Sequence, residues 1–229
     1  MMSKPTTSEP TTSEPTGFLY PFIEAEERDP SALVADLALS ARGKMGESRA
    51  MRAATIERCA DIVSQAAAAM ADCFSRGGRL LAFGNGGSAT DAESAVGLFV
   101  QPPGGRPLPA LSLVDDRAVL TALANDIGFD VVFSRQVIAH GRPGDMAIGF
   151  STSGDSRNVL RALEEASRRQ LLTIGLCGNQ GGAMAASDAV AHCFLVRSDS
   201  IHRIQEAQDA LVLRLWSAVQ HHLGEEGTP

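Results

Sequence analysis

The chain has 229 residues, of which 44% are hydrophobic and 5% aromatic, so it can bury one sizeable and mainly aliphatic core. Its formal net charge of −7 makes it a poor partner for a nucleic-acid backbone, and we expect no direct binding of DNA or RNA. No stretch has the roughly 18 apolar residues that a membrane span needs, and no secretory signal is evident at the N-terminus. We therefore expect a cytoplasmic protein without a membrane partner.

The first 45 residues differ in composition from the rest of the chain. Residues 3–16 contain TTSEP twice in tandem, and such a polar segment cannot bury enough apolar surface to fold. Helical periodicity begins at Ser31, which is a suitable N-cap residue. The expected divisions are a disordered tail (1–16), an extension with a short helix (17–45), one domain (46–224) and a C-terminal tail (225–229).

From residue 46 onward, helical patterns and short apolar runs alternate. The first helix is expected over 46–76, before the helix-ending pair Gly77-Gly78. Strands are expected at 80–83, 108–114, 146–150, 171–177 and 190–196. Helices are expected at 90–99, 118–123, 129–139, 156–169, 181–186 and 200–223. This alternation predicts an α/β fold with a five-stranded parallel sheet and right-handed crossovers.

Two turns made of small residues stand out, FGNGGS at 83–88 and FSTSGDS at 150–156. Each follows an expected strand and precedes an expected helix, so both should lie at the carboxyl edge of the sheet, where such folds bind ligands. The first N–H groups of a helix lack intrahelical partners and the helix dipole is positive there, which favours an anion. Serine hydroxyls add further donors. Helix capping alone would also favour serine and aspartate at these positions, but two such turns together predict a phosphate on a hydroxylated body.

Four ordered strings, FGNGGS, TALANDIGFDVVFSRQV, GDMAIGFSTSGDSRNVLRAL and HRIQE, resemble the sugar isomerase (SIS) domain over about residues 46–223. The closest branch contains the phosphoheptose isomerases and the DnaA initiator-associating protein. The resemblance implies a flavodoxin-like three-layer sandwich preceded by N-terminal helices, and a homotetramer with sites between subunits. It also implies that a sugar phosphate, such as a heptose phosphate, contacts Asn85, Gly86, Gly87, Ser88, Asn125, Asp126, Ser151, Thr152, Ser153, Ser156 and Gln205.

The chain departs from this family pattern at three positions. Metal-dependent members carry a His and a Glu in the helix after the first turn, and a His two turns after the glutamine of RIQE. These residues bind zinc or act as acid and base, whereas this sequence has Ser94, Leu98 and Leu213 there. Leucine can neither transfer a proton nor bind zinc. We therefore expect no metal or other cofactor, and isomerase activity that is weakened or lost.

Other residues offer a replacement acid or base, namely Asp91, Glu206 and His202. Each also has a structural interpretation, since carboxylates are common in first helical turns and Glu206 can pair with Arg203. Two alternatives to a binding protein without isomerase activity therefore stay open. One is an active isomerase with a rearranged catalytic set. The other is a regulatory protein-interaction module like the DnaA initiator-associating protein.

Overall fold

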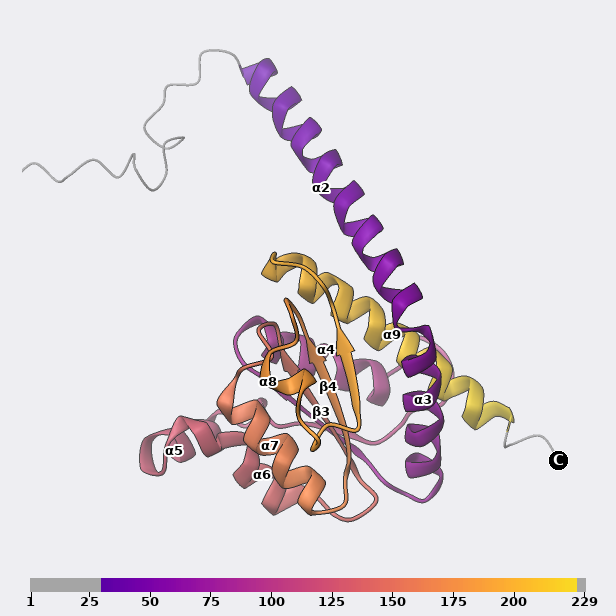
Figure 1. Cartoon of the computed structure of the whole chain (residues 1–229), viewed down its shortest axis with the longest axis vertical. Helices are drawn as coiled ribbons and strands as arrows, with labels where there is room; N and C mark the ends of the chain where they lie inside the picture. The colour runs from indigo at the N-terminus through magenta and orange to yellow at the C-terminus, as the bar shows by residue number, and fades with distance from the viewer. Residues whose placement is uncertain (1–29, 226–229) are drawn as a thin grey trace, which may run out of the picture. The chain divides into compact units, whose positions relative to one another are not determined.

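The structure is a computed structural model that describes residues 30–225 (Figure 1). The tail predicted at 1–16 lies outside the described residues, as do 17–29 of the predicted extension and 226–229 of the C-terminal tail. By its contacts the described part of the chain divides into two units, with the boundary between Met45 and Gly46. Within residues 30–225, no helix combines the length and the apolar character that crossing a membrane would require.

One long helix, α2 (Pro30–Arg58), stands where the sequence predicted a short helix and the start of a second one. The short-helix prediction was wrong, because Ala, Leu, Arg and Glu are strong helix formers and the isolated Gly43 and Gly46 each cost only about 1 kcal/mol. Ser31 is not the N-cap residue, since the helix already includes Pro30, whose fixed φ suits a first helical turn. The interruption falls at Cys59, before α3 (Ala60–Ser75).

The sheet has five parallel strands in the order β2-β1-β3-β4-β5. They are β1 (Leu80–Gly84), β2 (Ala110–Ser112), β3 (Met146–Ser151), β4 (Leu172–Cys177) and β5 (His192–Leu195). All five predicted strands are confirmed, although β2 is shorter than expected. It lies at the edge and pairs with β1 over three residues only, while the Leu108 N–H already bonds back to the carbonyl of Phe99.

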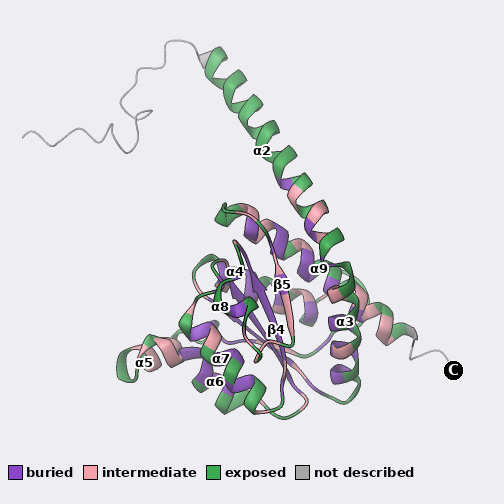
Figure 2. Ribbon diagram, in the orientation of Figure 1, coloured by how far each residue is buried: buried purple, intermediate pink, exposed green. Residues whose placement is uncertain are grey.

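Helices cover both faces of this sheet. After β1 they are α4 (Gly87–Val100), α5 (Arg117–Asp126), the 3-10 turn η2 (Phe129–Val131), α6 (Val132–His140), α7 (Arg157–Arg168), α8 (Gly182–Ala185) and α9 (Ile201–Glu225). Leu80 and Ala82 pack into a core with α3, α4 and α9, whereas Leu81 and Phe83 pack into a second core with α6 and α7. Figure 2 shows these buried strands between the helices. The predicted three-layer α/β architecture is therefore confirmed.

The strand order places the two small-residue turns beside each other. Strand β1 is followed along the chain by β2 on one side, but it pairs with β3 on the other side, so the direction of the sheet reverses between β1 and β3. At such a reversal the helices leave toward opposite faces and open a crevice beyond the carboxyl ends of the strands. The turn 83–88 leaves β1 and the turn 150–156 leaves β3, so both border this crevice.

Asp145 anchors the opposite end of β3 to its neighbours. Its carboxylate, 5% exposed, accepts hydrogen bonds from the backbone N–H groups of Arg79 and Arg142, both at 3.0 Å. We expect Asp145→Ala to lower the free energy of unfolding by about 1–3 kcal/mol, because two backbone donors lose their acceptor. Urea denaturation monitored by circular dichroism measures this loss.

The matched control for this prediction is Asp72→Ala on α3. Asp72 forms an exposed ion pair with Arg76, and such pairs contribute about 0–1 kcal/mol. Equal losses of stability in the two variants would show that Asp145 is no anchor.

Candidate functional site

Three serine hydroxyls converge in the turn after β3. Ser151 ends the strand with 2% exposure, and its Oγ lies 2.9 Å from Ser156 Oγ and 3.4 Å from Ser153 Oγ. The same Oγ accepts the Gly154 N–H at 3.1 Å. Ser156 precedes α7 as its N-cap residue, yet its side chain makes no capping hydrogen bond. Ser156 therefore does not serve as a plain helix cap, and the hydroxyls gather where the first N–H groups of α7 lack intrahelical partners.

Gly181 and the start of α8 pack against this turn and hold it in place. Asp155 Oδ1 accepts the N–H of Ala183 at 2.8 Å, and the Asp155 N–H donates to Ser153 Oγ at 3.1 Å. The backbone of Gly154 approaches so closely that a Cβ there would lie 2.0 Å from the carbonyl oxygen of Gly181. These contacts fix the turn before any ligand arrives, which lowers the cost of ordering it on binding.

A pair of asparagines joins the first turn to the start of α7, directly after the second turn. Asn85 follows β1 and Asn158 lies in the first turn of α7, and each side-chain amide donates to the other's oxygen at 2.8 Å. Asn158 is 3% exposed, while Asn85 is half-buried. Segments separated by more than 70 positions in the sequence are thus hydrogen-bonded at the crevice.

Helix α9 brings Gln205 onto the first turn. A Cβ added to Gly87 would lie 2.3 Å from Gln205 Nε2, so the amide occupies the space that a side chain at position 87 would need. The same nitrogen donates to Asp91 Oδ2 at 3.1 Å. Ile204, the preceding residue, packs over Gly178 close to the carbonyl of Thr152. The start of α9 therefore contacts the first turn and, through Gly178, comes near the second.

Asp91 is a buried carboxyl group beside the first turn, with 8% exposure. The pKa of Asp91 is raised to about 6, mainly by burial; the hydrogen bond from Gln205 works against this rise, and the charge of Asp209 adds to it. The pKa of Asp209 is also raised, by its own burial and then by the charge of Glu206. A carboxyl group with a pKa near 6 can exchange a proton close to neutral pH.

The other predicted residues occupy more peripheral places. Glu206 Oε2 lies 2.8 Å from Arg203 Nη1, so the structural interpretation of Glu206 as a partner of Arg203 is confirmed. His202 is exposed at the start of α9. Asn125 and Asp126 are exposed at the end of α5, where Asn125 Nδ2 donates to Asp126 Oδ1 at 2.8 Å. The roles of Asn125 and Asp126 as ligand contacts stay predictions.

Ser94, Leu98 and Leu213, the positions where a departure from the family pattern is expected, lie on α4 and α9, which pack together. Helical spacing places Ser94 and Leu98 on the same side of α4 as Asp91. Ser94 is exposed, Leu98 is half-buried against the core, and Leu213 on α9 is 50% exposed. Among residues 30–225, no group of three or more His, Cys, Asp or Glu side chains is arranged to hold a metal ion.

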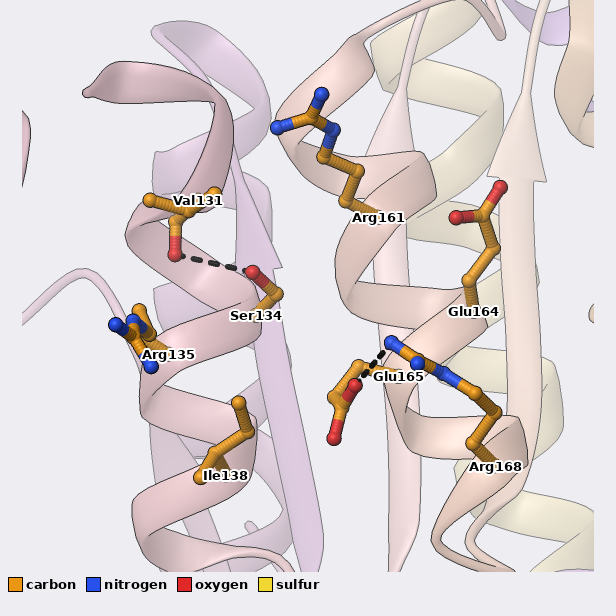
Figure 3. Close-up of a pocket in the computed structure, with 8 residues that line it drawn as sticks. All are labelled: Val131, Ser134, Arg135, Ile138, Arg161, Glu164, Glu165 and Arg168. Carbon is orange, nitrogen blue, oxygen red and sulfur yellow. Dashed lines mark hydrogen bonds and ion pairs between the residues drawn. The ribbon is translucent and has the colours of Figure 1, made fainter. Parts of the chain in front are cut away.

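A separate groove of about 340 Å³ lies between α6 and α7 (Figure 3). Its charges are partly paired within the groove itself, since Glu165 bonds Arg168 and also pairs with Arg169 at 2.6 Å. Neither small-residue turn lines this groove. The candidate site therefore rests on the two turns and α9 and does not include this groove.

Sequence reasoning missed two residues, Asn158 and Asp209. Asn158 stands in the first turn of a helix, where asparagine is common, and nothing in its local pattern indicates a partner 73 positions away. Asp209 follows Gln205 by one helical turn, so its spacing from RIQE was a usable signal. Its effect on Asp91 depends on how α9 packs against α4.

The family model described as the SIS domain matches residues 45–191. The chain belongs to the SIS domain family. A phosphoheptose isomerase of Solidesulfovibrio magneticus is 42% identical over 185 residues, which cover 78% of this chain and 87% of that protein. A phosphoheptose isomerase of a Roseiflexus species is 41% identical over 174 residues, covering 75% and 87%.

Solved structures agree with this assignment to the SIS family. The phosphoheptose isomerase GmhA from Neisseria gonorrhoeae superposes with a TM-score of 0.75 at 35% identity, covering 81% of this chain and 99% of that chain. A phosphoheptose isomerase from Francisella tularensis gives a TM-score of 0.74 at 32% identity, covering 80% and 97%. The SIS fold and the likeness to the phosphoheptose isomerase branch are therefore confirmed.

The raised pKa of Asp91 predicts a pH-dependent stability. Between its ordinary value of 3.8 and about 6, the folded chain holds the proton more tightly than the unfolded chain, so stability falls as pH rises through this window. The loss remains above pH 6. Relative to Asp91→Asn, wild type should lose about 1–2 kcal/mol of unfolding free energy between pH 4.5 and 7.5, after allowance for solvent screening.

Urea denaturation of both proteins across this pH range measures the difference. Glu93→Gln, which removes an exposed carboxylate from the same helix, controls for the loss of one charge. If the unfolding free energies of wild type and Asp91→Asn changed in parallel with pH, burial would not disfavour the ionised form of Asp91.

Proposed function

We propose that this SIS-domain chain binds a phosphorylated sugar, of heptose size or similar, in the crevice beyond β1 and β3. The observation that carries the proposal is the convergence of the Ser151, Ser153 and Ser156 hydroxyls at the start of α7. The phosphate would be held by these hydroxyls, by Thr152 and by the first N–H groups of α7. Backbone N–H groups and the helix dipole supply the positive potential, so no lysine or arginine is needed.

The sugar would extend from the phosphate toward the first turn. Asn85, Gly86, Gly87 and Ser88 border that side, and Gln205 reaches it from α9. Asn125 and Asp126 complete the proposed set, in a homotetramer whose sites lie between subunits. Their exposure leaves both side chains available to a ligand. The exposed Leu33, Val34, Leu37 and Leu39 of α2 support association, since clustered apolar side chains favour burial between chains.

We propose further that isomerase chemistry is weakened or lost, and that no zinc resides in the site. An aldose–ketose exchange requires a base at the carbon next to the carbonyl and an acid at the oxygen. Leu98 and Leu213 offer neither group, and Ser94 is a poor substitute for histidine. The named phosphoheptose isomerases have the same fold, so the proposed loss of activity would come from these three side chains alone.

A second candidate function, an active isomerase with a rearranged catalytic set, is favoured by one observation. Asp91 is buried beside the first turn and its pKa is raised to about 6, a value suited to a general base near neutral pH. In that case kcat/KM would rise with pH through about 6 as the carboxyl group ionises, and Asp91→Asn would abolish turnover.

The phosphate cradle predicts a specific loss of affinity. Ser153→Ala combined with Ser156→Ala removes two hydroxyls from the proposed phosphate contacts, and hydrogen bonds to charged groups contribute about 1.5–3 kcal/mol each. Affinity for sedoheptulose 7-phosphate should fall about ten-fold or more, as measured by titration calorimetry. Thermal unfolding should change little. A large fall in Tm with unchanged affinity would show that these serines stabilise the fold and do not bind the ligand.

Restoring the family residues tests the proposed loss of isomerase chemistry. Wild type incubated with sedoheptulose 7-phosphate, with and without zinc, should show little or no turnover by NMR. The triple variant Ser94→His, Leu98→Glu and Leu213→His should bind zinc and gain activity, because Gln205 would then have three further ligands beside it.

The double variant Ser94→His and Leu98→Glu, which keeps Leu213 and so lacks the added histidine on α9, is the matched control. Rapid turnover by wild type that Asp91→Asn abolishes would instead establish the second candidate function.

A further inference from the structure

The hydrogen bonds of Asn158 leave its side-chain amide only one orientation. Asn158 Oδ1 accepts the backbone N–H of Val159 at 3.0 Å. A backbone N–H can only donate, so the amide oxygen must face Val159. Turning the amide over would place its NH2 group against that N–H, which is unfavourable in a residue only 3% exposed. The backbone of α7 therefore fixes which atom of Asn158 is the donor.

The fixed orientation of Asn158 also fixes the orientation of the Asn85 side-chain amide. Asn158 Nδ2 donates to Asn85 Oδ1, and Asn85 Nδ2 donates to Asn158 Oδ1, both at 2.8 Å. With Asn158 fixed, Asn85 can keep both bonds in one orientation only. An asparagine amide has two N–H donors and an oxygen with two lone pairs, so the pair uses half of the capacity of Asn85. One donor and one acceptor position of the half-buried Asn85 then remain, in a defined arrangement.

We propose that Asn158 is a positioning residue for sugar recognition, which sets the donor and acceptor pattern that Asn85 presents to the hydroxyls of a phosphosugar. This inference rests on the proposed function and deepens it. Asn158 itself stays buried and acts through Asn85. The two turns then have different roles. The serine turn binds the phosphate, and the oriented Asn85 forms hydrogen bonds with the hydroxyls of the sugar.

These separate roles predict that a substitution at Asn158 changes affinity for the sugar phosphate but not for inorganic phosphate. Without Asn158, Asn85 can rotate and its amide atoms can exchange places, which weakens contacts to the sugar and leaves the serine turn intact. Asn158→Ala should lower affinity for sedoheptulose 7-phosphate roughly three- to ten-fold, the factor expected from disordering one or two neutral hydrogen bonds. Affinity for inorganic phosphate should stay within about two-fold of wild type.

A double-mutant cycle with Asn85→Ala tests the path of the effect. If Asn158 acts through Asn85, the double variant should bind sedoheptulose 7-phosphate no more weakly than Asn85→Ala alone. Asn158→Leu, which preserves side-chain volume without an amide, serves as a second variant in case the cavity left by alanine unfolds the chain. Titration calorimetry with both probes gives the affinities, and thermal unfolding confirms that each variant is folded.

Gln136→Ala is the matched control for losing a buried amide. Gln136, 4% exposed on α6, donates to the carbonyls of Leu113 and Val132 at 2.9 and 3.1 Å. Its removal should lower Tm and leave affinity for sedoheptulose 7-phosphate unchanged.

Six possible outcomes decide the inference. Selective loss of sugar-phosphate affinity that is not additive with Asn85→Ala supports it. Unchanged affinity in Asn158→Ala, additive losses, or an equal loss for both probes would overturn it while the proposed function stands. Failure of wild type to bind either probe would overturn the proposed function and this inference together. Binding of inorganic phosphate alone would overturn the inference and restrict the proposed function to anion binding.

Discussion

The candidate site depends on one constraint, the pairing of β1 with β3 in a sheet whose direction reverses between them. Gly84 pairs with Phe150 at the carboxyl ends of these strands, so the turns that follow must start as neighbours. Each turn opens a helix, and the two helices leave toward different faces of the sheet. The crevice is therefore a product of strand order, and the amide pair between the turns holds its two walls together.

Helix α9 forms a third wall of the crevice, and its packing there lowers the stability of the fold. Its glutamine lies over a residue without a side chain, and its packing against α4 encloses a carboxyl group whose ionised form is disfavoured by burial. Proteins commonly accept such locally unfavourable arrangements at functional sites and compensate elsewhere. Here two hydrophobic cores on opposite faces of the sheet, both of which bury phenylalanines, provide that compensation.

Local patterns were enough to predict the strands, the alternation with helices and both turns, because each depends on residues close together in the sequence. The sequence did not predict that α2 is continuous. Its two glycines lower the stability of the helix, but the strong helix formers around them outweigh that cost. The interruption at Cys59 has no glycine or proline to mark it. Asn158 and the protonation of Asp91 depend on which strand pairs with β1 and on where α9 packs, and neither is encoded locally.

The carboxylates on α4 and α9 give the crevice an asymmetric distribution of charge. Asp91 and Asp209 lie toward the Gln205 side, while the N-terminus of α7 and its serines lie on the other. A molecule that carries all of its negative charge at one end is repelled by the first group and attracted by the second. At the proposed site, such a molecule would therefore bind more favourably with its charged end toward the serines, before any individual hydroxyl is recognised.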